Sequence, residues 1–205
     1  MASSPRPALA AKFVIEWIAA LVALLLLAPV MLLTAAVVRF SGPGPILHRR
    51  RVVGRHGVPF DAFKFRTMVA DAEAWLERDS TMREAFEGRF KLRHDPRVTP
   101  VGRVLRRYSL DELPQLANVL RGEMALIGPR MVSPAEVIKY GEHRDRLFTV
   151  RPGLTGLWQV SGRQTTTYEE RVALDMTYIS RWSPWLDLSI ALRTPRAVLK
   201  AHGAF

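Results

Sequence analysis

The 205-residue sequence contains no cysteine, and this absence excludes disulfide bonds, thiolate metal sites and cysteine nucleophiles. It has five histidines, none at the spacing of a metal site or a catalytic triad, so we interpret them as structural or surface residues. Acidic residues are also few: 19 Asp and Glu oppose 30 Lys and Arg and leave a net charge of +11. That surplus predicts a polyanionic partner, which is nucleic acid, an anionic membrane surface or a phosphorylated substrate.

Charge is absent altogether from Trp17 to Val38. A helix needs about 20 residues to cross a hydrocarbon core of roughly 30 Å, and this run meets that length. A cleaved signal peptide is the first alternative, but its apolar region is shorter, about 7 to 15 residues. The run therefore predicts a membrane-embedded helix near the N-terminus.

Pro29 stands near the middle of this apolar run, where it removes one backbone hydrogen bond and crowds the carbonyl of Leu25. Basic residues flank both ends, Lys12 before the run and Arg39 after it, and such residues favour the cytoplasmic side of a membrane. A helix that breaks at Pro29 and returns to the same side satisfies both ends. We therefore predict a re-entrant membrane helix within residues 1–40, with a kinked helix that spans the bilayer as the alternative.

Residues 41–205 predict one globular unit, so that the chain as a whole is α+β and mostly helical. Amphipathic helices are expected at Met68–Phe90 and in the C-terminal segment Trp182–Leu199. The C-terminal segment is rich in Trp, Leu and Ile, which suits a helix in the lipid headgroup layer. A buried core helix is the competing interpretation, and the sequence does not separate the two.

A small β-hairpin is predicted near the start of this unit. Apolar and polar residues alternate at 46–53 and at 60–65, on either side of a turn that contains two glycines. The second strand would place Lys64 and Arg66 on one face and its aromatic residues on the other. We favour a phosphate contact for Lys64 and leave the role of Arg66 open.

The stretch Gly102–Arg130 contains an adjacent acidic pair. Ser109 and Glu112 have the spacing of a capping box, in which each side chain accepts a hydrogen bond from the other residue's backbone N–H. Pro114 is tolerated only near a helix start, so Asp111 and Glu112 are expected in a first helical turn. Helix capping alone explains the pair without any chemistry, because the helix dipole favours carboxylates there.

The residues around this pair favour a binding site instead. Several arginines lie near it in the sequence: Arg103, Arg106, Arg107, Arg121 and Arg130. Guanidinium groups bind phosphate oxygens through paired hydrogen bonds. So many cations beside two carboxylates predict a substrate that carries several phosphate charges.

These residues, together with the segments Arg151–Arg163 and Tyr168–Arg171, closely resemble the bacterial sugar transferase family, the monotopic polyprenyl-phosphate phosphoglycosyl transferases. The resemblance runs from about Lys12 to about Leu199, with the motifs in the same order and spacing. The chain departs from the family pattern at Ala28, where relatives have serine before the proline. It also departs at Met131, where many relatives have a second proline.

The resemblance implies a re-entrant membrane helix and transfer of a sugar 1-phosphate, expected to be a hexose 1-phosphate, from a UDP-sugar to undecaprenyl phosphate with release of UMP. It implies Mg²⁺ as cofactor and a catalytic unit on the cytoplasmic face of the bacterial inner membrane, at the first membrane step of exopolysaccharide assembly. Asp111 is expected to be the nucleophile that forms a phosphosugar intermediate, with Glu112 beside it and both as metal ligands. The expected donor-binding residues are Lys64, Arg106, Arg130, Arg151 and Arg163.

Two other interpretations remain at this point. The acidic pair could serve as metal ligand and base in a direct transfer between the two bound substrates, or the protein could be a non-catalytic membrane partner that binds anionic lipids. Nucleic acid is disfavoured, because the basic residues lack the interleaved aromatic residues of a stacking platform. The sequence leaves open which sugar is transferred and whether the chain forms a homo-oligomer.

Overall fold

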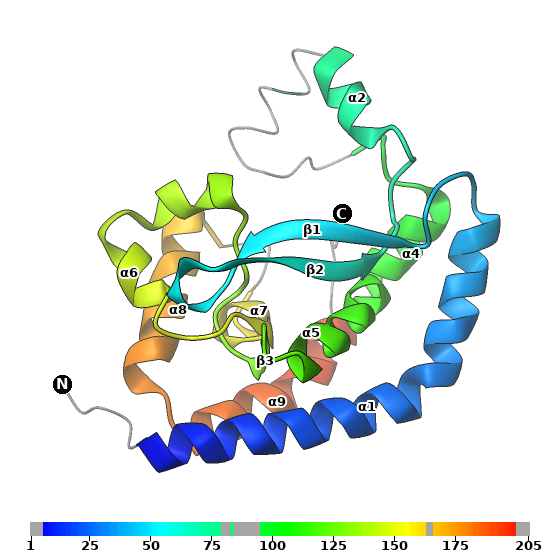
Figure 1. Ribbon diagram of the computed structural model, residues 1–205. Helices are drawn as coiled ribbons and strands as arrows, with labels where there is room; N and C mark the ends of the chain where they lie inside the picture. The colour runs from blue at the N-terminus through cyan, green and yellow to red at the C-terminus, as the bar shows by residue number, and fades with distance from the viewer. Residues whose placement is uncertain (1–5, 79–82, 84–94, 163–165, 200–205) are drawn as a thin grey trace.

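The computed structural model describes residues 6–78, 83, 95–162 and 166–199, and it is mostly helical with small sheets (Figure 1). The predicted α+β class is confirmed. In chain order the elements are α1 (Arg6–Phe40), β1 (Leu47–Val53), η1 (Arg55–Gly57), β2 (Pro59–Phe65), α2 (Ala72–Arg78), α4 (Pro100–Arg107), η2 (Leu110–Gln115), α5 (Leu116–Leu120), β3 (Ala125–Ile127), η3 (Pro134–His143), α6 (Arg144–Leu147), β4 (Gly153–Thr155), α7 (Leu157–Val160), α8 (Tyr168–Arg181) and α9 (Pro184–Leu199). Most of the helix expected at Met68–Phe90 beyond α2 lies outside the described residues.

Helix α1 is one element of 35 residues with Pro29 inside it. Figure 1 shows it running along the bottom of the molecule and then turning upward on the right, as expected for a proline that removes a hydrogen bond. Before the proline, Ala20 packs in a core with the hairpin and α5. After it, Val38 packs in a core with Phe65 and Leu105. Both halves of the helix therefore rest on the same globular unit.

The outer faces of α1 and α9 are apolar and uncovered. Among the described residues, only the helix at Pro7–Phe40 is long and apolar enough to cross a membrane by length and composition. Leu26 and Leu32 of α1 are 74% and 72% exposed, and Trp185 and Leu192 of α9 are 77% and 73% exposed. A buried core position for the C-terminal helix is therefore wrong, and its exposed face suits contact with lipid.

A polar cluster fastens α1 to α9. The Nζ of Lys12 donates to Glu16 Oε1 at 2.6 Å and to Asp187 Oδ2 at 2.7 Å. Tyr178 and Trp182 donate to the same Asp187 carboxylate at 2.8 and 2.9 Å. We call these five residues the anchor cluster.

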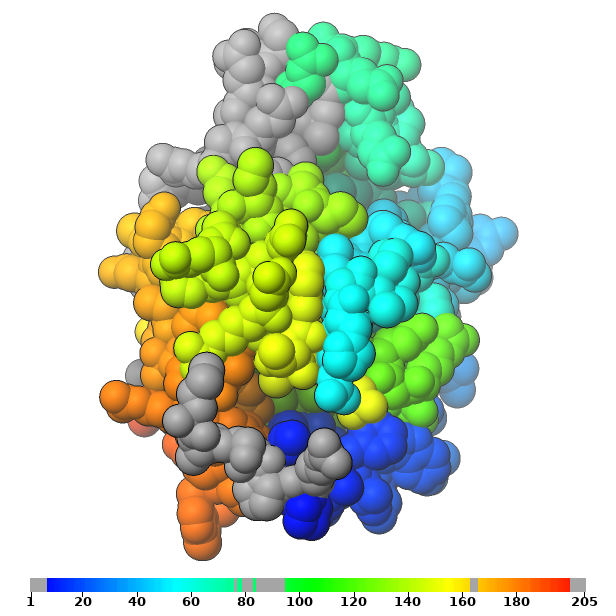
Figure 2. All heavy atoms as spheres, turned by 60° about the vertical axis from the view of Figure 1, so that its left-hand side comes forward, coloured from blue at the N-terminus to red at the C-terminus, as the bar shows by residue number. Residues whose placement is uncertain are grey.

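The predicted hairpin is confirmed. Strands β1 and β2 pair antiparallel, with His48 opposite Lys64 and Arg50 opposite Ala62. Figure 2 shows β1 (cyan) lying against the yellow-green segment 134–150. Arg66, whose role the sequence left open, is structural: its guanidinium donates to the carbonyls of Val38, Gly42 and Pro43 and so holds the turn after α1.

A second, parallel pair of strands supports the loop that carries Arg130. Strands β3 and β4 pair with Ala125 opposite Gly153. A Cβ on Gly153 would lie 2.1 Å from the Gly128 nitrogen, and one on Gly156 would lie 2.0 Å from the Gly128 oxygen. Both glycines therefore allow the close approach of the backbone at Gly128.

Candidate active site

The acidic pair lies at the start of a 3₁₀ turn, not in a capped α-helix. Ser109 has a left-handed backbone with φ of 55°, and its side chain makes no capping hydrogen bond to the helix. The expected capping box is therefore wrong, because an N-cap residue needs an extended backbone to aim its oxygen at the first turn. Asp111 and Glu112 do lie in the first turn of η2, as expected. Their side chains are left free for other partners.

Glu112 is held by two cations from distant parts of the chain. Lys64 Nζ donates to its Oε1 at 2.7 Å, and Arg130 Nη1 donates to its Oε2 at 2.9 Å. Arg130 Nη2 also donates to Oε1, which makes the pair bidentate. Burial alone would raise the pKa of Glu112, but Arg130 and Lys64 outweigh it and hold that pKa well below the usual glutamate value. Glu112 is therefore a fixed anion.

Asp111 is in a different state, although it is the next residue. It is 6% exposed, and Lys64 Nζ lies 3.7 Å from its Oδ2, which is ion-pair distance but too long for a hydrogen bond. Within the described part of the chain its carboxylate accepts no hydrogen bond. Burial raises the pKa of Asp111 and the charge of Glu112 adds to this effect, while Lys64, Arg106 and Arg130 oppose it. Among the described residues the structure thus leaves one largely buried carboxylate without a hydrogen-bond donor beside a group of cations.

Arg106 reaches this site from α4. Thr99 caps the start of that helix, since its side chain accepts a hydrogen bond from Gly102 N at 2.9 Å. Arg106 Nε donates to Thr67 Oγ1 at 2.9 Å. Burial lowers the pKa of Arg106, and the nearby charge of Asp111 opposes this. Arg106 therefore lies close enough to Asp111 to attract its charge.

The other two predicted donor-binding residues are not seen at the pair. The guanidinium of Arg151 lies over the ring of Phe13 from α1, 4.4 Å from its centroid. The charged neighbours that affect its pKa are Arg55 and Glu16, and neither belongs to the acidic pair. Arg163 falls outside the described residues.

Arg50, which the sequence pattern did not single out, lies half-buried beside the site. Its Nη2 donates to Glu136 Oε2 at 2.8 Å. Burial lowers the pKa of Arg50, Glu136 opposes this, and the neighbouring charges include Arg130 and Glu112. The signal was available, because a strand period of two places Arg50 on the same face as the inward-pointing Ala62 and Lys64.

The residues present suit Mg²⁺ shared with a substrate. Mg²⁺ prefers hard oxygen ligands and is commonly held by one or two carboxylates plus substrate phosphates. Asp111 offers a carboxylate without hydrogen bonds, whereas both oxygens of Glu112 are already occupied by Lys64 and Arg130. The described residues contain no group of three or more acidic, histidine or cysteine side chains that would hold a metal without help.

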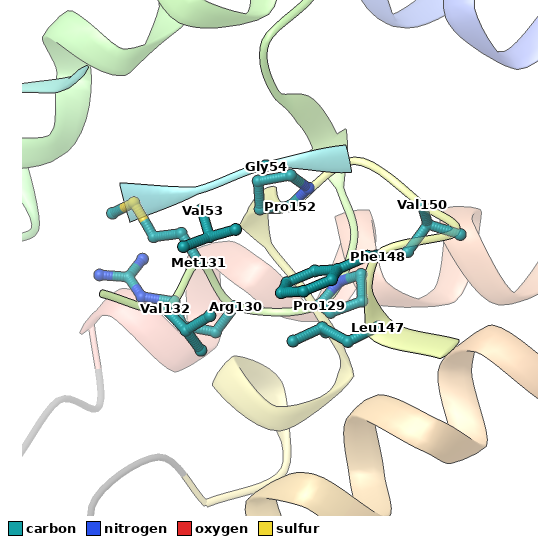
Figure 3. A pocket seen from close by; sticks show the side chains of 10 residues that line it. All are labelled: Val53, Gly54, Pro129, Arg130, Met131, Val132, Leu147, Phe148, Val150 and Pro152. Atoms are coloured by element: carbon teal, nitrogen blue, oxygen red, sulfur yellow. The ribbon is translucent and has the colours of Figure 1, made fainter. Parts of the chain in front are cut away.

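Behind Arg130 lies a small apolar cavity. Its volume is about 10 Å³, and Figure 3 shows side chains such as Pro129, Leu147 and Phe148 around it. That volume is room for about one water molecule, so no nucleotide fits there. This cavity is therefore not a nucleotide site, whereas the guanidinium of Arg130 contacts Glu112 outside it.

Comparison with known proteins gives one consistent match. Residues 7–201 match the family described as bacterial sugar transferase. The exopolysaccharide production protein ExoY of Rhizobium meliloti is 44% identical over 199 residues, covering 95% of this chain and 88% of that protein. The UDP-glucose:undecaprenyl-phosphate glucose-1-phosphate transferase of Caulobacter vibrioides is 42% identical, covering 95% of this chain and 72% of that protein.

The undecaprenyl-phosphate galactose phosphotransferase of Salmonella typhimurium is 41% identical, covering 95% of this chain. The chain spans only 41% of the length of that protein, and the same share of the UDP-galactose-lipid carrier transferase of Erwinia amylovora. The family match covers the acidic pair, its cations and the long apolar helix alike. The chain belongs to the bacterial sugar transferase family.

Proposed function

We propose that the protein transfers a sugar 1-phosphate from a UDP-sugar to polyprenyl phosphate and releases UMP. The observation that carries this proposal is the state of Asp111, a buried carboxylate without hydrogen bonds beside Lys64, Arg106 and Arg130. A carboxylate is already ionised at neutral pH and needs no base to act as a nucleophile. The cations offset the repulsion between that carboxylate and an incoming diphosphate.

In the first step, an oxygen of Asp111 attacks the phosphorus that bears the sugar. The bond between that phosphorus and the bridging oxygen of the diphosphate breaks, and the electron pair leaves with UMP. The sugar phosphate is then joined to Asp111 as an acyl phosphate. Glu112 cannot attack the same phosphorus, because neighbouring residues of a helical turn point in directions about 100 to 120° apart and Lys64 and Arg130 already hold its oxygens.

In the second step, an oxygen of polyprenyl phosphate attacks the same phosphorus. The bond to Asp111 breaks, its carboxylate is regenerated, and the sugar joins the lipid through a diphosphate. Lys64, Arg106 and Arg130 attract the phosphate oxygens in both steps. Mg²⁺ bound by Asp111 and the substrate phosphates, close to Glu112, would neutralise part of the charge that develops on UMP.

A re-entrant placement of α1 supports the lipid substrate. Both halves of the helix pack on the same unit, at Ala20 and at Val38, while its outer face is apolar. A straight helix across the bilayer would carry one half away from the catalytic unit. With Lys12 and Arg39 both on the cytoplasmic side, the catalytic unit lies on the cytoplasmic face at headgroup depth.

The donor is best sought among UDP-hexoses. The names of the relatives specify glucose 1-phosphate in the Caulobacter protein and galactose in the Salmonella protein. We extend to this chain the hexose 1-phosphate class that the two have in common. We also propose a role in exopolysaccharide production, which the name of the Rhizobium protein specifies.

The test is a UMP-release screen over UDP-glucose, UDP-galactose and N-acetylated UDP-sugars, with the protein in lipid nanodiscs, Mg²⁺ and undecaprenyl phosphate. We expect one UDP-hexose to support turnover, and Asp111→Asn to reduce it by at least about 1000-fold. Asp61→Asn is the matched control, because Asp61 is an exposed carboxylate on the hairpin that pairs with Arg51 at 3.1 Å. Substantial turnover by the Asp111 variant would remove that residue from the nucleophile role.

Two further outcomes address the alternatives. UMP release without undecaprenyl phosphate supports a stepwise reaction, whereas strict dependence on the lipid supports direct transfer between both bound substrates. Salt-sensitive binding to anionic vesicles without UMP release from any UDP-sugar supports a non-catalytic lipid-binding protein.

A further inference from the structure

The motif Tyr168–Arg171 begins α8, and its side chains take no part in the two proposed steps of the reaction. Arg171 is 8% exposed, although it is charged. Its guanidinium contacts two aromatic rings, 5.0 Å from the centroid of Trp158 and 5.1 Å from that of Tyr168. Stacking of this kind fixes the plane of an arginine, which a lysine in the same place would not reproduce.

The guanidinium of Arg171 contacts the loop that carries Arg130. Its Nη2 donates to the carbonyl of Met131 at 3.3 Å and to that of Arg130 at 3.5 Å. Asp175, one turn further along α8, lies near the same loop, since the charge of Arg130 is among those that lower its pKa. The same Asp175 accepts from Tyr140 at 2.7 Å, which fixes it in turn. Arg171 of α8 thus binds the backbone of both Arg130 and Met131.

Arg171 also forms an ion pair with Glu136. Its Nη1 lies 3.5 Å from Glu136 Oε1. Glu136 accepts hydrogen bonds on its other oxygen from Arg50 and from the backbone and side chain of Ser133, each at 2.8 Å. A continuous set of contacts therefore runs from β1 through Glu136 and Arg171 to the Arg130 backbone. The guanidinium of Arg130 in turn holds Glu112.

We propose that Arg171 is a positioning residue for Arg130. It holds the Arg130–Met131 backbone against α8, so that the Arg130 guanidinium faces Glu112 and the donor diphosphate. The inference rests on the proposed function for its effect on catalysis. It rests on the contacts alone for its effect on the loop.

The kinetic test is a double-mutant cycle between Arg171→Lys and Arg130→Gln, measured as kcat/KM for the UDP-sugar. We expect Arg171→Lys to lower kcat/KM by about tenfold in the wild-type background and by less than about twofold when Arg130 is already Gln. Arg181→Lys is the matched control, because Arg181 is exposed at the end of the same helix. An equal loss in both backgrounds would overturn the proposal, since a general loss of stability does not depend on Arg130.

A second readout does not require turnover. Hydrogen exchange of the peptide that contains residues 128–132 should become faster in Arg171→Lys and stay unchanged in Arg181→Lys. If the wild-type protein releases no UMP but this difference is found, the proposed function fails and the positioning of the loop stands. Unchanged exchange in Arg171→Lys would overturn the positioning whatever the activity.

Should Arg171→Lys fail to fold, Tyr168→Leu removes one of the two stacking rings and keeps the arginine. We expect a smaller loss of kcat/KM in the same direction, again only when Arg130 is present. A loss that persists in the Arg130→Gln background would contradict the proposal.

Discussion

The anchor cluster and the acidic pair are built on the same plan, with one lysine between two carboxylates. In the anchor cluster, Lys12 lies within 2.7 Å of both Glu16 and Asp187. At the site, Lys64 lies 2.7 Å from Glu112 but 3.7 Å from Asp111. The two clusters therefore differ in hydrogen bonding. In the anchor cluster both carboxylates accept a hydrogen bond from the lysine, whereas at the acidic pair only Glu112 does.

The remaining partners reinforce this difference. Asp187 also accepts from Tyr178 and Trp182, and Glu16 also accepts from the backbone N–H of Ile127 at 3.0 Å. Asp111 has no comparable donor in the described part of the chain. A saturated carboxylate stabilises the fold, whereas an unsatisfied one keeps its lone pairs for a ligand or a phosphorus atom.

The largest expected effect comes from removing the shared cation of the site. Lys64→Met should lower kcat/KM by about 100-fold or more, because Asp111 and the diphosphate lose the cation between them. Steady-state UMP release measures this. Membrane association should be unchanged, since Lys64 makes no contact with the outer face of α1; detachment of the variant from membranes would count against the comparison.

The same change in the anchor cluster should affect stability instead. Lys12→Met leaves Glu16 and Asp187 partly buried without their cation, at a cost of about 3 kcal/mol. Denaturation of the detergent-solubilised protein measures the loss. The folded fraction should keep a kcat within about threefold of the wild type. A kcat reduced as much as in Lys64→Met would show that the two clusters do not have separate roles.

Asp175, on α8, is another buried carboxylate, and its pKa allows a test by pH. Burial raises its pKa to about 6, while Arg171 and Tyr140 oppose the shift. The folded-state pKa is above the unfolded value, so the protonated form stabilises the fold. That stability is complete below about pH 4 and is lost as the pH rises through about 6.

We therefore expect Asp175→Asn to gain stability relative to the wild type between pH 4 and pH 7, by about 2 to 3 kcal/mol. Urea denaturation at both pH values measures the relative change. A difference between the two proteins that does not vary with pH would mean that Asp175 has an ordinary pKa.

The smallest expected effect is on the acid limb of the rate profile. Since burial raises the pKa of Asp111, kcat/KM should fall on acidification with a midpoint above the ordinary aspartate value of 3.8. In Lys64→Met the midpoint should move to higher pH, because Lys64 favours the ionised form. An unchanged midpoint in that variant would show that the charge of Lys64 does not affect the pKa of the titrating group.

The local features of the fold were predictable from the sequence. The hairpin follows from alternation, the start of α4 from Thr99, and the end of α5 from Gly122, whose φ is 74°. The start of η2 was not predictable in detail. Ser109–Glu112 fits a capping box by spacing, but Ser109 has a left-handed backbone and Glu112 pairs with Lys64 and Arg130.

The contacts that position the site join distant parts of the chain, and sequence spacing does not reveal them. Arg50 and Glu136 are 86 residues apart, and Arg171 reaches carbonyls 40 and 41 residues before it. The motif at Tyr168–Arg171 was visible as a pattern, but its direction toward Arg130 depends on how α8 packs. The contact between Gly153 and the backbone at Gly128 is of the same kind, because it joins segments that are distant in the sequence.

The most direct measurement is the mass of the Asp111-containing peptide after brief incubation of the membrane-embedded protein with its UDP-sugar and Mg²⁺, without lipid acceptor, followed by an acid quench. We expect a sugar phosphate on Asp111 that disappears when undecaprenyl phosphate is added before the quench. An unmodified Asp111 during active turnover, or the adduct on another residue, would contradict this expectation.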